Sequence, residues 1–113
     1  MKINEIYNYL DSLSAFSLQE KWDNSGLIVG NMNDEFESIY ISLDLDLNTI
    51  KNIKKNSLFI THHPLIFSAL KKINDDSYNK KILKKLLKKN IALISMHTNI
   101  DKTHLNKYVT EKI

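Results

Sequence analysis

The sequence contains no cysteine and no arginine. Without cysteine the chain has neither disulfide bonds nor thiolate zinc sites, so nitrogen and oxygen atoms must hold any metal ion that it binds. All 16 basic residues are lysine, and the formal net charge is +3. Arginine supplies the bidentate and stacking contacts that recognition of bases and phosphates favours, so its absence argues against nucleic acid as a partner.

The sequence also lacks a long hydrophobic run. No apolar stretch approaches the roughly 18 residues of a membrane span, and the first five residues (MKINE) are polar. We therefore expect neither a signal peptide nor a membrane anchor, and we expect a cytoplasmic protein without a membrane partner.

Proline and glycine are scarce. Pro64 is the only proline, and both glycines, Gly26 and Gly30, fall within residues 22–30. That segment combines a polar turn with a short apolar strand. It is a weak candidate for a phosphate-binding loop, because it has no glycine-rich repeat and no following helix. Eight lysines between residues 71 and 89 are interleaved with apolar residues at helical spacing, which is typical of a solvated helix face.

The pattern of apolar residues predicts an α/β protein. Strand-like apolar runs alternate with segments that have three- and four-residue spacing, which indicates βαβ units and a largely parallel sheet covered by helices. The predicted strands span residues 27–29, 39–43, 58–61 and 91–96. The predicted helices span residues 3 to about 13, 47–53 and 78–89. A last helical face is predicted at Leu105, Tyr108, Val109 and Ile113.

Candidate metal ligands follow two of these strands. His62 and His63 come directly after the strand at 58–61, and His97 and Asp101 follow the strand at 91–96. Ligands of parallel sheets bind beyond the carboxyl ends of the strands, so these side chains should meet at one edge. Three imidazoles and a carboxylate favour a divalent ion such as zinc, iron, manganese or nickel.

Adjacent residues of a strand point to opposite faces, so the chain must turn after residue 61 if His62 and His63 are to share a site. Pro64 supports such a break. The two imidazoles could then each serve one ion of a close pair, with Asp101 bridging or capping. The alternative is a hydrogen-bonding role, which is the more common one for a single histidine such as His97 at a strand end.

Four segments together resemble the YbgI or Nif-three-like dinuclear metal-centre family, many of whose members are named homologues of GTP cyclohydrolase 1 type 2. The resemblance covers essentially the whole chain and rests on residues 22–27 (WDNSGL), 42–44 (SLD), 60–67 (ITHHPLIF) and 97–101 (HTNID).

The resemblance implies a three-layer α/β/α fold and homohexamers with metal sites facing an inner cavity. It implies that His62, His63 and Asp101 form the N-terminal half of the ligand set for two divalent ions, which a histidine and a glutamate from a C-terminal segment complete. We expect residues 1–113 to form a single α/β domain, the N-terminal part of a longer protein. His104, the fourth histidine, is expected at the surface.

The function implied is a metal-dependent hydrolase that opens the imidazole ring of GTP, with a nucleotide or another small molecule as substrate. His97 could shuttle a proton as a catalytic residue, and Asp44 or Asn99 could orient water or substrate; for each of the three, a purely structural role is the equal alternative. Two other interpretations stay open: a metal-binding scaffold or interaction protein without turnover, and a dimetal phosphoesterase.

Overall fold

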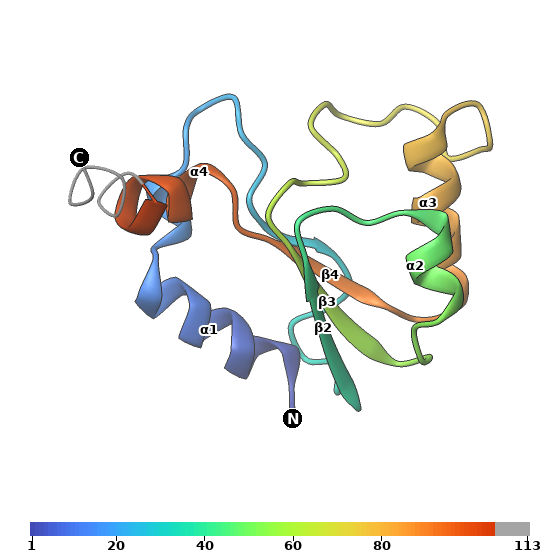
Figure 1. Ribbon diagram of the computed structural model, residues 1–113, viewed down its shortest axis with the longest axis horizontal. Helices are drawn as coiled ribbons and strands as arrows, with labels where there is room; N and C mark the ends of the chain where they lie inside the picture. The colour runs from blue at the N-terminus through green and yellow to red at the C-terminus, as the bar shows by residue number, and fades with distance from the viewer. Residues whose placement is uncertain (106–113) are drawn as a thin grey trace.

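A four-stranded sheet runs through the middle of the protein, of which the computed structural model describes residues 1–105 (Figure 1). The strand order is β1-β4-β3-β2; β2, β3 and β4 are parallel, and β1 runs antiparallel to β4. The predicted largely parallel sheet is therefore confirmed, with β1 as its one antiparallel strand within the described residues. The strands are β1 (Gly26–Val29), β2 (Ser38–Ser42), β3 (Ser57–Thr61) and β4 (Ala92–Ser95).

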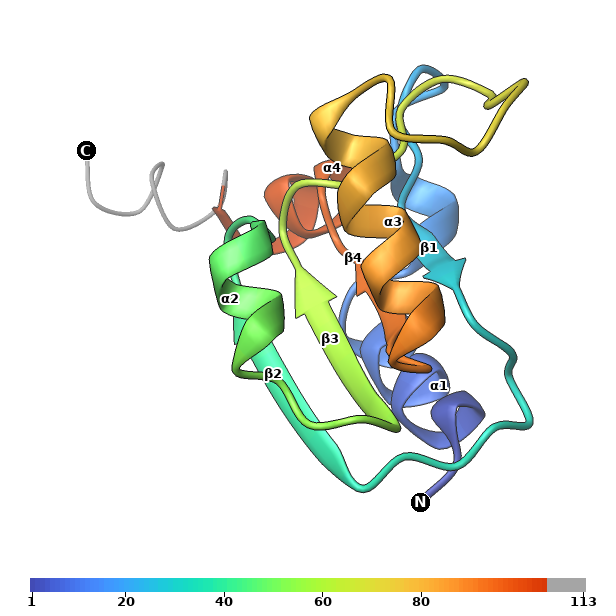
Figure 2. The ribbon, with the colours of Figure 1, turned by 90° about the vertical axis from the view of Figure 1, so that its right-hand side faces the viewer.

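Helices cover both faces of the sheet, as predicted. Figure 2 shows α2 and α3 in front of the sheet and α1 behind it. Two apolar cores result, one between the sheet and α2 and α3, the other between the sheet and α1. The helices are α1 (Ile3–Leu13), α2 (Leu47–Lys51), α3 (Tyr78–Lys88) and α4 (Thr98–Ile100), with a 3-10 turn at Phe16–Leu18 and a π-helical turn at Asp101–Leu105.

The helices begin where the sequence provides caps. The side chain of Ser77 accepts a hydrogen bond from the backbone N–H of Lys80 at the start of α3, and Asp46 accepts one from Thr49 at the start of α2. These bonds satisfy N–H groups that lack partners in the first helical turn. The buried side of α3 carries Ile82, and its lysines face away from the core, as the sequence predicted.

The three parallel strands end in register. Ser42 pairs with Thr61, and Thr61 pairs with Ser95, so the residues that follow these strands begin at the same level of the sheet. The hydroxyls of Thr61 and Ser95 are buried and hydrogen-bonded to each other at 2.8 Å. This register places the segments that begin at residues 62 and 96 side by side.

Of the last predicted helical face, Tyr108, Val109 and Ile113 lie outside the described residues. Among residues 1–105 there is no helix with the length and apolar character needed to cross a membrane.

Gly30 lies where a side chain has no room. Its φ is +112°, and a Cβ there would come within 2.8 Å of the Ala92 Cβ. Gly26 has a similar φ of +125°, but its Cβ would meet only the Tyr7 hydroxyl at 3.9 Å.

We therefore expect Gly30→Ala to lower the free energy of unfolding by about 3 kcal/mol or more, because backbone strain and overpacking of β4 combine. Gly26→Ala should cost only about 1–2 kcal/mol, since it adds the strain alone. Urea unfolding of both variants measures this difference. Equal losses would contradict the close packing of Gly30 against β4.

Candidate metal centre

The chain bends directly after β3, at the two adjacent histidines. The backbone N–H groups of His62 and His63 both donate to the carbonyl oxygen of Leu43, at 3.2 and 3.1 Å. This bend releases the two residues from strand geometry, so their ring centroids lie only 4.9 Å apart. The break predicted ahead of Pro64 is confirmed.

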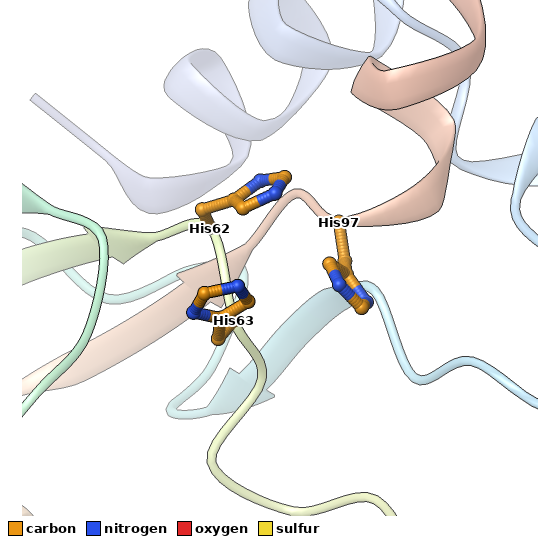
Figure 3. Close-up of side chains that lie close together, drawn as sticks. All are labelled: His62, His63 and His97. Atoms are coloured by element: carbon orange, nitrogen blue, oxygen red, sulfur yellow. The ribbon is translucent and has the colours of Figure 1, made fainter.

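His97 approaches the same point from the end of β4. Its ring centroid lies 5.1 Å from that of His62 and 5.4 Å from that of His63. Figure 3 shows the three imidazoles gathered where β3 and β4 end. Each ring offers one ligand atom, and these atoms lie within 4.8 Å of one another. An ion bound tetrahedrally at about 2.0–2.1 Å separates its ligands by roughly 3.4 Å, so small rotations of the side chains would close the group.

Every imidazole of this histidine cluster (His62, His63 and His97) has an oxygen beside Nδ1. Nδ1 of His62 lies 2.8 Å from the carbonyl oxygen of Met96. Nδ1 of His63 lies 2.8 Å from the carboxylate of Asp44, and Nδ1 of His97 lies 3.1 Å from the carboxylate of Asp23. An acceptor at Nδ1 fixes the proton on that atom and leaves the lone pair on Nε2 of the neutral ring. Metal-binding histidines are held by the same kind of outer contact.

Asp101, predicted as a ligand, lies next to the histidine cluster. One carboxylate oxygen is 3.4 Å from Nε2 of His62, and the side chain is 32 % exposed. The ligand roles of His62, His63 and Asp101 and the catalytic role of His97 stay predictions, because the geometry is compatible with His97 as a ligand or as a proton carrier. His104 is exposed and lies beside the hydroxyl of Thr103.

Two other polar residues, Asp44 and Asn99, make structural hydrogen bonds, which is one of the two roles expected for them. Asp44 bonds to His63 Nδ1, so its carboxylate orients an imidazole. Asn99 is fully buried, and its side-chain amide donates to the carbonyl of Ser14, so it anchors the segment after α1.

Sequence reasoning gave no role to Asp23, whose side chain is 0 % exposed and lies behind His97. One carboxylate oxygen accepts from the backbone N–H and hydroxyl of Thr98 and from the hydroxyl of Ser25; the other accepts from His97 Nδ1 and the N–H of Asn24. Because β1 runs antiparallel to β4, the residues before β1 lie at the edge where β4 ends, and no sequence pattern indicates that direction.

The hydrogen bonds determine the charge state of Asp23. Burial alone would raise its pKa, but the bonds donated by Thr98, His97 and Asn24 outweigh burial and hold the pKa of Asp23 well below its usual range. The carboxylate is therefore ionised at all physiological pH values and strengthens each bond that it accepts.

We expect Asp23→Asn to lower the free energy of unfolding by about 2–4 kcal/mol at neutral pH, since an amide cannot accept all of these bonds. Because the folded-state pKa is depressed, the stabilisation is present above the unfolded pKa of about 3.9 and is lost as the pH falls below it. Urea unfolding as a function of pH, with a chelator present, should show a steeper acid loss in the unmodified protein than in Asp23→Asn.

The matched control is Asp34→Asn, because the exposed side chain of Asp34 makes no hydrogen bond within the described residues. Its stability should match that of the unmodified protein at every pH. Equal stability of the Asp23 and Asp34 variants would refute the structural role of Asp23.

Comparisons with curated proteins place this geometry in a known group. The chain is 55 % identical over 113 residues to the GTP cyclohydrolase 1 type 2 homolog of Campylobacter jejuni, covering all of this chain and 47 % of the relative. It is 55 % identical over 106 residues to GTP cyclohydrolase 1 type 2 of Helicobacter pylori strain J99, covering 94 % of this chain and 44 % of the relative. The chain thus spans a little under half the length of these relatives.

Solved structures have the same fold. The Staphylococcus aureus protein SA1388 aligns with a TM-score of 0.79 at 36 % identity, over 89 % of this chain and 29 % of that one. Reduced HcgD from Methanocaldococcus jannaschii aligns with a TM-score of 0.77 at 36 % identity, over 89 % and 41 %. The model of the Duf34/NIF3 family matches residues 1–113. The resemblance of the four sequence segments is therefore confirmed, and the chain belongs to the Duf34/NIF3 (NGG1p interacting factor 3) family.

Proposed function

We propose that the histidine cluster, with Asp101, holds a divalent metal ion and forms part of a centre for two such ions. The observation that carries this proposal is the meeting of the three imidazoles, which offer one ring nitrogen each within 4.8 Å of one another and have an oxygen partner beside every Nδ1. Neutral nitrogen donors and a carboxylate fit zinc, iron, manganese or nickel. Three histidines and one carboxylate are too few for two ions, so further ligands must come from outside the described residues or from water.

We infer further that the protein uses this centre for hydrolysis, with the opening of the imidazole ring of GTP as the reaction. The names of the Campylobacter jejuni and Helicobacter pylori relatives support this choice. A bound divalent ion would supply Lewis acidity that makes water nucleophilic near neutral pH, for attack on the electrophilic carbon of the imidazole ring.

The residues of this chain have separate tasks in that reaction. His62 and His63 would hold the ion from the bend after β3, and Asp101 would add its carboxylate beside His62. Asp23 keeps the proton on Nδ1 of His97, so Nε2 of His97 is the atom that binds the ion or takes up a proton from water. The carboxylate of Asp44, bonded to Nδ1 of His63, holds that imidazole ring in its orientation.

The first test is metal binding by calorimetric titration with Zn²⁺ or Mn²⁺. We expect this chain to bind with low affinity and fewer than two ions, because it carries only part of the ligand set. His63→Ala and Asp101→Asn should each lower the affinity about tenfold or more, since each removes a ligand atom.

His104→Ala is the matched control, because His104 is the one histidine outside the cluster. The metal affinity of this variant should equal that of the unmodified chain. Tight binding of two ions per chain would show that the ligand set is complete within residues 1–113. Unchanged affinity in both ligand variants would overturn the metal centre itself.

Product analysis separates the three functions. With GTP and added Mn²⁺, Fe²⁺ or Zn²⁺, a protein extended to the length of the relatives should release formate if it is a cyclohydrolase and phosphate if it is a phosphoesterase. If neither formate nor phosphate is released while metal binding is intact, the result would favour the metal-binding scaffold. Activity that survives a strong chelator would exclude all metal-dependent hydrolysis.

We also propose that the protein forms homo-oligomers, with the hexamer implied by the family resemblance as the expected state. Within residues 1–105 the outer edge of β2 has no strand partner, and Ile41 on β2 is 74 % exposed. Unprotected apolar edges favour association.

Ile41→Lys should therefore shift the molecular mass measured by light scattering toward that of the monomer, because a charge on β2 opposes edge pairing. A mass that is the same with and without the substitution would exclude this edge as the contact. Urea unfolding checks that Ile41→Lys keeps the fold.

A further inference from the structure

Two large aromatic side chains stand exposed beside the histidine cluster. Trp22 is 62 % exposed and Phe67 is 51 % exposed. Each ring centroid lies 6.0 Å from that of His97, and the planes meet at 79° and 74°, which is an edge-to-face arrangement. Indole and phenyl rings are costly to leave in water, and these two lie against the same imidazole, where they offer an apolar surface that a flat ligand can cover.

The loops that carry these rings are tied together. Trp22 precedes β1, whereas Phe67 follows the bend after β3, 45 residues later in the chain. The side-chain amide of Asn24 donates to the carbonyl of Ile66 at 2.7 Å and joins the two loops next to the aromatic residues. Asp23 holds the Trp22 loop to the segment after β4. The backbone segments that carry the two rings are therefore held in place before any ligand arrives, which lowers the entropic cost of binding.

A cavity of about 320 Å³ opens on the Phe67 side of the cluster. Its wall includes His63 and Asp44 as well as Phe67 and Asn79. The volume lies at the lower end of the range of about 300–1,000 Å³ that is typical of small-molecule sites. Trp22 lies outside this wall, and Phe67 supplies its phenyl ring. That ring, next to a carboxylate and an amide, suits a flat ligand that has polar groups on its edge.

We propose that Trp22 and Phe67 form an aromatic rim that binds the planar heteroaromatic ring of a nucleotide-type ligand and positions it at the histidine cluster. This inference rests on the proposed function, because it names the part of the substrate that the site holds. A flat ring stacks on indole or phenyl, and its edge groups can meet Asp44 and Asn79.

The test uses fluorescence, because Trp22 is the only tryptophan of the chain and reports on the rim directly. Guanosine 5′-monophosphate and ribose 5-phosphate are titrated separately, first with a chelator and then with Zn²⁺. We expect guanosine 5′-monophosphate to quench Trp22 with a saturable curve in both conditions. Ribose 5-phosphate has the same sugar and phosphate but no heteroaromatic base, and it should cause no saturable change.

Variants locate the effect. Phe67→Ala should weaken binding of guanosine 5′-monophosphate about tenfold, and Phe67→Tyr should restore it, since one stacking partner is lost and then replaced. Trp22→Ala and Trp22→Phe, followed by calorimetry, should behave in the same way. Tyr9→Ala is the matched control, because Tyr9 on α1 is 60 % exposed and makes no aromatic contact with the cluster among the described residues. Circular dichroism checks the fold of each variant.

The outcomes separate this inference from the metal proposal. Nucleotide binding that persists in a chain that fails to bind metal would remove the metal centre and keep the rim. A chain that binds metal but responds equally to guanosine 5′-monophosphate and ribose 5-phosphate would overturn the rim alone. So would metal binding together with an unchanged affinity of Phe67→Ala for guanosine 5′-monophosphate. The inference would also be overturned if no nucleotide binds and the Trp22 emission changes with protein concentration in the absence of ligand. That result would assign the rim to contact with a second copy of the chain.

Discussion

The geometry of the candidate site depends on one buried carboxylate, that of Asp23. It joins the loop before β1 to Thr98 after β4, two segments that are 75 residues apart in sequence, and it fixes the orientation of His97. Its five hydrogen bonds also keep it ionised, so each bond is charge-assisted. Without this anchor, the position of His97 and of Trp22 next to the cluster would rest on weaker contacts.

The remainder of the site follows from the sheet. Because β3 and β4 are parallel and end in register, His62, His63 and His97 begin from the same level. The bend onto the carbonyl of Leu43 then allows two adjacent histidines to face one point. Each Nδ1 lies beside an oxygen, and one nitrogen of each ring lies within 4.8 Å of the others. Pre-arranged donors of this kind reduce the cost of ordering side chains when a ligand binds.

Much of this could be predicted from the sequence, because strands and helices have different apolar periods and the histidines directly follow strands. The parallel sheet, its covering helices and the meeting of His62, His63 and His97 at one edge were reached in this way. Asp23 could not be, since its role depends on β1 being antiparallel, and the short apolar run after Gly26 carries no information on strand direction. The partnership of Asp44 with His63 was also missed, because a carboxylate at a strand end looks the same in sequence whether it faces substrate or an imidazole.

We propose above all that the histidine cluster holds a divalent ion, with at least two of its three imidazoles as ligands. Anomalous X-ray diffraction at the zinc edge, from crystals of this protein grown with Zn²⁺, tests the claim most directly. The account predicts a peak about 2.0–2.1 Å from Nε2 of His62, His63 or His97, with at least two of these atoms as ligands. A zinc peak at His104 or at surface carboxylates, with the cluster empty, would contradict it.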